Sequence, residues 1–366
     1  MILGIDVSTY PEELAGGAVY YDGDVPIDPL DAFRQNGVDY MRIRIWNHPW
    51  GPNGEPYLAG TCDLDNYVKL GTLAKSKGYR LYMDLHYSDF WADPGKQFPP
   101  REWEGYTVDQ LETAVYDFTR HCLTVAREAG VAPDIIQVGN EITNGILWPV
   151  GRLSEGEGER GNYENLCRLL RAGCRACREE APHARIMLHL ERSNDCAVYR
   201  EFFSRMETEG VPYDIIGASY YPYWHGTPDE LFRNLDGCRR FGKEIMIAEL
   251  GYGFTTEAYS LGGENKRLVI DAERAYVKGV SERYPLTPEG QAAFVKYMLG
   301  AARERGIAGV FYWEPLWLPG EGMCWASPAA QTYICEEGKS TANEWANQCL
   351  FDYDGKMLPA FREYRK

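Results

Sequence analysis

The sequence predicts an α/β protein with the (β/α)8 TIM-barrel fold, in a single domain that spans residues 1–366. Short runs rich in β-branched and aromatic residues alternate with longer segments of helical periodicity, which indicates parallel strands joined by crossover helices. Eight such runs are present, the number that closes a barrel. We see no linker, internal repeat or low-complexity tract that would separate a second domain.

The eight strand-like runs share similar joints. They cover residues 3–8, 40–46, 81–87, 135–141, 184–190, 215–221, 244–250 and 309–314. A glycine stands shortly before several runs, where a left-handed conformation ends a helix: Gly37, Gly78, Gly210 and Gly306. Helical periodicity lies between the runs, as at 108–129, 163–180 and 291–305. A doubly wound open sheet is the alternative, but the first run lacks the GxGxxG turn that usually follows in that fold.

The composition narrows the classes of partner. The chain carries 54 acidic and 38 basic side chains, a formal net charge of −16. Such a charge repels nucleic-acid phosphates and anionic lipid surfaces, and it would also repel a polyuronic acid. No stretch approaches the roughly 18 uninterrupted apolar residues of a membrane-spanning helix. We therefore expect no nucleic acid or membrane as partner, and a neutral or cationic ligand.

The ten cysteines indicate a reducing compartment. Cys167, Cys174 and Cys177 fall on one face of a predicted helix, and their CxxC has no second CxxC to complete a zinc site. We expect buried free thiols there. The N-terminus shows neither the basic nor the apolar region of a signal peptide. The sequence therefore predicts a cytoplasmic protein, or a secreted one if a leader has been removed.

Charged side chains gather where the predicted strands end, which in a barrel is where catalytic groups collect. Glu141 and Glu249 lie at the ends of the fourth and seventh runs, across the barrel mouth from one another. Glycoside hydrolysis needs two such carboxyl groups, one to protonate the leaving oxygen and one to attack or to activate water. Period-two alternation places Arg42 and Arg44 on one side of the second strand. Pairing with these arginines is the structural alternative for both glutamates.

The aromatic content, 13% of the chain with 26 tyrosines and 10 tryptophans, gains meaning from its position. Eight tryptophans lie at or after predicted strand ends: Trp46, Trp50, Trp91, Trp148, Trp224, Trp313, Trp317 and Trp325. The face of a sugar ring packs on an indole, and the indole N–H can donate to a hydroxyl. Core packing explains any single one of them, but eight on one rim favour a carbohydrate-binding groove.

Other chemistries fit the motifs less well. Asp84 and His86 share one side of the third strand, but the first strand lacks the His-x-His of a barrel metallohydrolase. His86, His189 and His225 are scattered, and a GxSxG elbow, a P-loop and an HExxH helix are missing. A metal-dependent barrel hydrolase is therefore the weakest alternative, and a non-catalytic carbohydrate-binding barrel is another.

Several segments are more specific than these patterns. They are MRIRIWNHP (41–49), DLHYSDFWADPGKQ (84–97), QVGNEI (137–142), SYYPYWHG (219–226), ELGY (249–252), WANQ (345–348) and LFDYDGK (350–356). At these segments, and over nearly its whole length, the sequence resembles glycoside hydrolase family 53, the endo-β-1,4-galactanases of clan A. The Asn-Glu pair alone would mark only the clan, whereas 84–97 and 219–226 are specific to the family.

The resemblance implies a retaining endo-hydrolase of β-1,4-galactan, as in type I arabinogalactan, the neutral side chain of pectin. Glu141 would be the acid/base and Glu249 the nucleophile, while Asn140 would hold the sugar 2-hydroxyl. Arg44 and Tyr220 would hydrogen-bond the nucleophile and keep it ionised. Further supporting or substrate-binding residues would be Asp84, His86, Asp89, Trp91, Trp224, His225, Trp313 and Trp317.

The resemblance leaves open the identity of the glycan substrate and the presence of a bound metal ion. Another β-1,4-glycan, such as mannan, cellulose or xylan, is the alternative substrate within the clan. No cofactor is required for the reaction, and some members bind a structural calcium ion for which we match no ligand set, so the metal stays unassigned. We expect a monomer in which the long segments 252–285 and 315–343, after strands 7 and 8, wall an open groove suited to cleavage within a polymer.

Three expectations concern the geometry and charge of the site. The two carboxyl groups should lie about 5–5.5 Å apart, as in retaining enzymes. The pKa of Glu249 should be low beside Arg44, and neighbouring negative charge should raise that of Glu141 toward neutrality. The fifth strand departs from the expected family pattern, because Glu191 and Arg192 at its end are bulkier and more charged.

Overall fold

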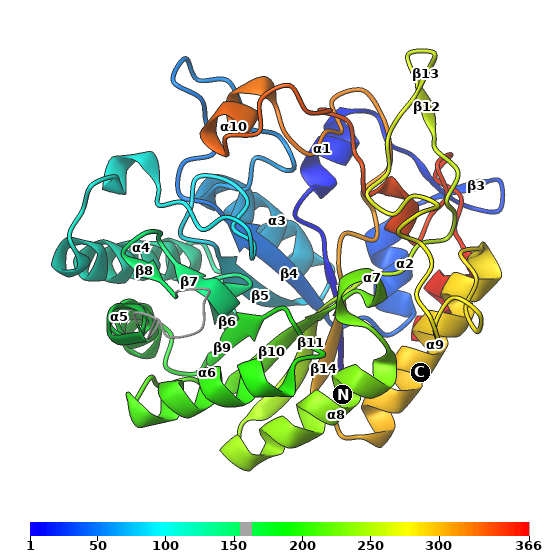
Figure 1. Ribbon diagram of the computed structural model, residues 1–366. Helices are drawn as coiled ribbons and strands as arrows, with labels where there is room; N and C mark the ends of the chain where they lie inside the picture. Colours follow the sequence, from blue (N-terminus) through cyan, green and yellow to red (C-terminus); the bar gives the residue numbers. More distant parts are fainter. Residues whose placement is uncertain (154–162, 366) are drawn as a thin grey trace.

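The computed structural model describes residues 1–153 and 163–365 and shows a closed barrel of eight parallel strands (Figure 1). In order around the barrel they are β1 (Ile2–Asp6), β4 (Tyr40–Ile45), β5 (Arg80–Leu85), β6 (Ile135–Val138), β9 (Arg185–Leu190), β10 (Ile215–Tyr220), β11 (Glu244–Leu250) and β14 (Gly309–Tyr312). Neighbouring strands are parallel, and β14 closes the barrel on β1. The predicted (β/α)8 fold and all eight predicted strands are confirmed.

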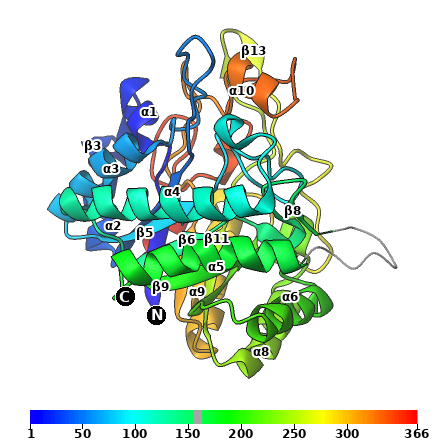
Figure 2. The same ribbon diagram turned by 90° about the vertical axis from the view of Figure 1, so that its left-hand side faces the viewer.

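Helices connect the strands and cover the outside of the barrel (Figure 1). The longer ones are α2 (Pro29–Gln35), α3 (Leu64–Ser76), α4 (Val108–Glu128), α5 (Tyr163–Glu180), α6 (Cys196–Thr208), α8 (Pro228–Cys238) and α9 (Pro288–Glu304). Figure 2 shows α4 and α5 lying side by side on this outer face. Thr107, Thr227 and Thr287 start α4, α8 and α9 because each hydroxyl accepts a hydrogen bond from a backbone N–H of the first turn. The three predicted helical segments are confirmed.

Shorter elements lie in the connections. They are α1 (Tyr10–Ala15), α7 (Pro222–His225), α10 (Pro328–Tyr333), and the paired strands β2 (Tyr20–Asp22) with β3 (Val25–Ile27), β7 (Gly145–Ile146) with β8 (Gly151–Arg152), and β12 (Ser260–Leu261) with β13 (Glu264–Asn265). A final 3-10 helix, Pro359–Tyr364, packs against α9. Within 1–153 and 163–365, no helix is both long and apolar enough to cross a membrane.

The prediction of buried free thiols on one helix is confirmed, whereas the predicted compartment stays a prediction. All ten cysteines are free, and Cys167, Cys174 and Cys177 are buried on α5. Burial raises the pKa of the Cys167 thiol to about 11 and that of Cys174 to about 12, so both stay protonated at neutral pH. These thiols therefore act as small apolar packing groups.

The barrel interior changes from apolar to polar along its axis. Near the N-terminal ends of the strands, inward side chains form one buried cluster: Tyr40, Tyr82, Ile135, Met187, Ile215, Met246 and Phe311. Gly4 leaves room for this layer, because a Cβ there would lie 2.2 Å from the ring of Phe311. The next inward positions carry charged and amide side chains, starting with Arg42 and Asp84, and these form the floor of the site.

Candidate active site

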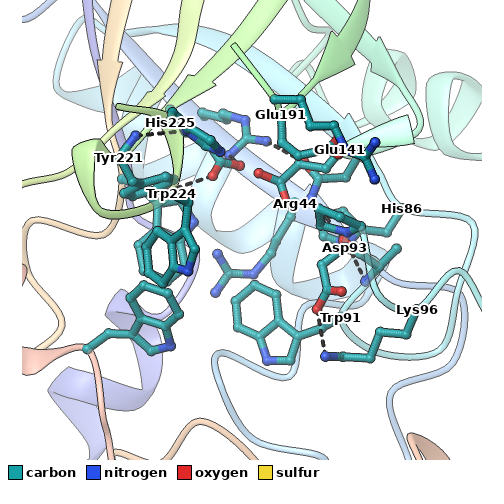
Figure 3. Close-up of a pocket in the computed structure, with 18 of the residues that line it drawn as sticks. Arg44, His86, Trp91, Asp93, Lys96, Glu141, Glu191, Tyr221, Trp224 and His225 are labelled. Atoms are coloured by element: carbon teal, nitrogen blue, oxygen red, sulfur yellow. Dashed lines mark hydrogen bonds and ion pairs between the residues drawn. The ribbon is translucent and has the colours of Figure 1, made fainter. Parts of the chain in front are cut away.

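A pocket of about 510 Å³ opens at the C-terminal ends of the strands, where the sequence predicted the site (Figure 3). Charged, amide and aromatic side chains dominate its wall: Arg42, Arg44, His86, Trp91, Asp93, Lys96, Asn140, Glu141, Glu191, Arg192, Tyr221, Trp224, His225, Glu249, Trp313, Trp325 and Trp345. The connection after β14 supplies the last two of these. The segment 252–285 supplies no residue of the described pocket wall, but it reaches the rim, where the guanidinium carbon of Arg274 lies 5.6 Å from the ring centre of Trp224. The segment also braces the neighbouring connection, because Asn347 Nδ2 donates to the carbonyls of Thr255 and Ile270.

Glu141 follows β6 in a left-handed conformation with φ of 51°. Residues with side chains rarely adopt this conformation, and strain of this kind concentrates at functional sites. Asn140 anchors the turn because its Nδ2 donates to Ala92 O at 2.9 Å. The Glu141 carboxyl group faces the pocket, where Oε1 accepts a hydrogen bond from Ser219 Oγ at 2.6 Å.

Glu249 lies near the end of β11 and is buried. Its Oε1 is 2.9 Å from Arg42 Nη1, and its Oε2 accepts a hydrogen bond from the Tyr221 hydroxyl at 2.8 Å. His225 Nδ1 accepts a hydrogen bond from the backbone N–H of Tyr221 at 3.1 Å, which fixes the position of that tyrosine. Both oxygens of Glu249 therefore meet donors that stabilise the ionised carboxylate.

The predicted contact between Arg44 and Glu249 is wrong, because Arg42 takes that place. Both arginines point inward from β4, but Arg44 lies one inward position nearer the barrel mouth. It pairs with Glu314 Oε1 at 2.7 Å, and its guanidinium carbon lies 4.2 Å from the ring centre of Trp91. Arg44 therefore holds an aromatic residue of the pocket wall in place.

The predicted contact between Tyr220 and Glu249 is also wrong. The Tyr220 hydroxyl donates to Gly226 O at 2.9 Å, and its ring stacks on Phe294 of α9, outside the barrel. Successive residues of a strand face opposite sides. Because Ser219 points into the barrel, toward Glu141, the next residue faces the helices, and Tyr221 points inward again and lines the pocket.

Arg42 is the buried cation at the centre of the floor. Its Nη1 lies 2.8 Å from Asp6 Oδ2, and its Nη2 lies 2.8 Å from Asp84 Oδ2, in addition to the contact with Glu249. Opposite charges this close offset the desolvation cost of a buried guanidinium. Asp84, predicted to support substrate binding, lies below the pocket wall and orients both Arg42 and His86, whose Nε2 is 3.0 Å from Asp84 Oδ2.

A hydrogen-bond chain connects Asn140 to Glu141 through two buried side chains. Asn140 Oδ1 accepts from Gln137 Nε2 at 3.0 Å. His189 Nδ1 lies 3.0 Å from both of these atoms, so it donates to Asn140 in one tautomer of the ring and accepts from Gln137 in the other. The other ring nitrogen, His189 Nε2, lies 2.9 Å from Ser219 Oγ and accepts from the serine in the first tautomer. The single hydroxyl proton of Ser219 can point to His189 or to Glu141. The serine can therefore bond to Glu141 in its protonated and in its ionised form.

The surroundings of the two glutamates separate their pKa values. Burial and the negative charges of Glu249 and Glu191 raise the pKa of Glu141 well above its ordinary value, which confirms that prediction. Burial also raises the pKa of Glu249, although Arg42 and the hydrogen bond from Tyr221 oppose the rise. The prediction of a low pKa for Glu249 is wrong because burial outweighs its cation. The order still assigns the proton to Glu141.

One carboxylate oxygen of each glutamate and one ring nitrogen of His189 lie within 4.8 Å of one another. Three such groups could hold a metal ion, but both nitrogens of His189 already bond to Asn140 and Ser219. The short spacing bears more directly on acid–base chemistry. Retaining glycosidases hold their carboxyl groups about 5–5.5 Å apart, and inverting ones about 6.5–9.5 Å.

Tryptophans form a large part of the pocket wall, as predicted, although not all the predicted ones contribute. The wall contains Trp91, Trp224, Trp313, Trp325 and Trp345. Trp313 and Trp345 meet with ring centres 5.3 Å apart, and Trp224 is 41% exposed at the rim. The contribution of Trp345 is not predicted from the sequence because the residue lies far beyond the last strand. Exposed indole faces of this kind suit the faces of sugar rings.

Comparison with known proteins agrees with this geometry. The sequence profile of glycosyl hydrolase family 53 matches residues 2–364. The chain belongs to glycosyl hydrolase family 53. It is 32% identical to an endo-beta-1,4-galactanase of Bacillus subtilis (strain 168) over 385 aligned residues, which cover 100% of this chain and 85% of that protein. A Niallia circulans protein described as "Uncharacterized protein in bgaB 5'region" is 36% identical, with 98% and 92% covered.

A solved structure shares the whole fold. The family 53 catalytic domain of Ignisphaera aggregans matches with a TM-score of 0.88 and 34% identity, covering 100% of this chain and 95% of that one. Membership of family 53 makes the protein a glycoside hydrolase with a polysaccharide substrate.

Two residues that the family resemblance implied as binding residues lie behind the pocket wall of this family 53 barrel. Asp89 is 1% exposed and braces two connections, because its oxygens accept hydrogen bonds from the backbone N–H groups of His48 and Arg101 at 3.0 Å. Trp317 is equally buried and packs behind Trp313, with ring centres 5.8 Å apart. The remaining predicted binding residues, His86, Trp91, Asn140, Trp224, His225 and Trp313, do line the pocket.

Proposed function

We propose that the protein is a retaining endo-β-1,4-galactanase that cleaves galactan by double displacement. The observation that carries the proposal is the pair Glu141 and Glu249, which have oxygens within 4.8 Å of each other in unequal surroundings. This spacing leaves no space for a water molecule between carboxylate and sugar, so one carboxylate attacks the sugar directly. Retention of configuration follows from two successive displacements.

In the first step, Glu249 attacks the anomeric carbon while Glu141 protonates the glycosidic oxygen. Arg42 and Tyr221 keep Glu249 ionised for this attack. Bond formation removes the negative charge of Glu249, which lowers the pKa of Glu141. Glu141 can then take a proton from the water that releases the sugar. The two hydrogen-bonding directions of the Ser219 hydroxyl suit both stages.

The substrate assignment is supported by charge, wall chemistry and the named relative. A chain of net charge −16 with an indole wall suits a neutral polysaccharide. Asn140 keeps one N–H of its amide after donating to Ala92, and that N–H can bind a sugar hydroxyl. The Bacillus subtilis relative is called an endo-beta-1,4-galactanase. Mannan, cellulose and xylan remain the alternatives within the barrel glycosidases.

A reducing-sugar assay over linear β-1,4-galactan, mannan, cellulose and xylan tests the substrate. We expect turnover on galactan and at most traces on the others; preference for another glycan would contradict the assignment. Glu249→Ala should lose nearly all hydrolysis while still binding galactan. Glu244→Ala, at the exposed start of the same strand, serves as the control. A Glu249→Ala protein that keeps a tenth of wild-type turnover would refute the role of that residue.

A further inference from the structure

A third carboxylate of the pocket has no role in the steps above. Glu191 directly follows β9 and is 4% exposed, and neither of its oxygens has a hydrogen bond of good geometry in the described part of the chain, although Thr143 lies near enough to lower the pKa of the carboxyl group somewhat. The nearest cationic atom is Arg192 Nε, 3.7 Å from Oε1, beyond hydrogen-bonding distance. A buried polar group without hydrogen bonds is costly. Its presence therefore points to a ligand that supplies donors.

Glu191 lies beside the proposed acid. Both residues line the same pocket, and the negative charge of Glu191 helps to raise the pKa of Glu141. Figure 3 shows the two glutamates next to each other, apart from the tryptophans on the other sides of the pocket. The pocket thus has an indole wall and, beside the acid, a polar corner made of Glu191 and Arg192.

We propose that Glu191 binds hydroxyl groups of the sugar on the leaving-group side of the cleaved bond. The inference rests on the proposed function, because the acid must stand next to the oxygen that leaves with that sugar. A side chain next to Glu141 therefore meets the leaving sugar and not only the sugar attacked by Glu249. The two oxygens of one carboxylate can accept from two neighbouring hydroxyls, which would satisfy both at once.

A second effect of Glu191 must be separated from binding. Burial raises the pKa of Glu191 itself to about 7, and its charge also raises that of Glu141. Loss of the charge would therefore shift the pH profile on every substrate, whatever its leaving group. Loss of sugar contacts would lower kcat/KM only on substrates whose leaving group carries the hydroxyls. A pair of substrates that differ only in the leaving group distinguishes these effects.

The test compares linear β-1,4-galactan with the nitrophenyl glycoside of β-1,4-galactobiose, whose aryl leaving group has no sugar hydroxyls. Each enzyme is measured at its own pH optimum. We expect Glu191→Ala to lower kcat/KM on galactan by about 10- to 100-fold, as for lost hydrogen bonds to a charged group, and on the aryl glycoside by less than about 3-fold. Glu191→Gln, which keeps one carbonyl acceptor, should recover part of the galactan activity.

Equal losses on both substrates, or an unchanged kcat/KM on galactan, would overturn the proposal. Glu264→Ala, in the exposed strand β13, is the control for removing a carboxylate elsewhere. If Glu191→Ala fails to fold, Glu191→Gln carries the same comparison, with an expected loss on galactan alone. If the wild type cleaves another glycan in place of galactan, the proposed substrate fails. The same ratio, measured on that glycan and its aryl glycoside, then still tests Glu191.

Discussion

Tyr221→Phe removes one hydroxyl from the surroundings of Glu249 and leaves the ring in place. That hydroxyl donates to Glu249 Oε2 at 2.8 Å, and its donation lowers the pKa of the carboxyl group. The ring packs edge-on against Trp313 and is buried, so phenylalanine can keep the same packing. The substitution therefore changes the electrostatics of the proposed nucleophile with little change in shape.

The size of the effect follows from the kind of hydrogen bond that is lost. A hydrogen bond to a charged group contributes about 1.5–3 kcal/mol. One pKa unit corresponds to about 1.36 kcal/mol, so the loss raises the pKa of Glu249 by about 1–2 units. The sign is upward because the hydroxyl stabilises only the ionised form.

The assay is the pH dependence of kcat/KM on galactan. Glu249 must be ionised to attack, so activity falls as the pH drops through the first apparent pKa of the coupled Glu141–Glu249 pair. In Tyr221→Phe this acidic limb should move upward by about 1–2 pH units. Activity on the plateau above the limb should change less than activity below it.

Tyr220→Phe is the matched control, since the Tyr220 hydroxyl donates to Gly226 O outside the pocket. It should leave the acidic limb where it is. An acidic limb that moves in Tyr220→Phe and stays fixed in Tyr221→Phe would refute the assignment of donors to Glu249.

Two further predictions concern the neighbours of the glutamates. In the wild type the hydrogen bond from Ser219 lowers the pKa of Glu141, so Ser219→Ala should raise that pKa. The basic limb of kcat/KM should then move upward by about one pH unit, and a downward shift would contradict this. In Arg42→Lys a single ammonium cannot reach the three carboxylates that the guanidinium joins. The free energy of unfolding, measured in denaturant, should fall by about 3–5 kcal/mol. Arg185→Ala, which removes the exposed ion pair between Arg185 and Glu244, is the control and should lower it by less than about 1 kcal/mol.

The fold could be predicted because its signals are local and repeated. Eight runs of strand-forming residues, glycine joints and helical periodicity each report on a short window of sequence, and together they specify a barrel. The end of each strand then places Glu141 and Glu249 at the mouth without knowledge of any contact. The short distance between their oxygens follows from the closed barrel rather than from either segment.

The partners of Glu249 could not be assigned from the same signals. Arg42 and Arg44 both point into the barrel at different heights along its axis, and the sequence does not show which of the two arginines contacts Glu249. Tyr221 could have been found, because alternation from Ser219 places it in the pocket and Tyr220 outside.

Other features depend on long-range packing. The place of Trp345 in the wall depends on a connection that folds back from far beyond β14. The raised pKa of Glu249 depends on burial, which outweighs a cation that a sequence pattern can suggest. The expected cytoplasmic location and monomeric state stay predictions.

The stereochemistry of the first product tests the central claim most directly. Proton NMR of linear β-1,4-galactan, recorded during hydrolysis, resolves the α and β signals of new reducing ends before they interconvert. Two displacements by Glu249 and Glu141 predict that the β signal appears first and the α signal grows later by mutarotation. Reducing ends that appear first in the α configuration, or no new reducing ends at all, would contradict the account.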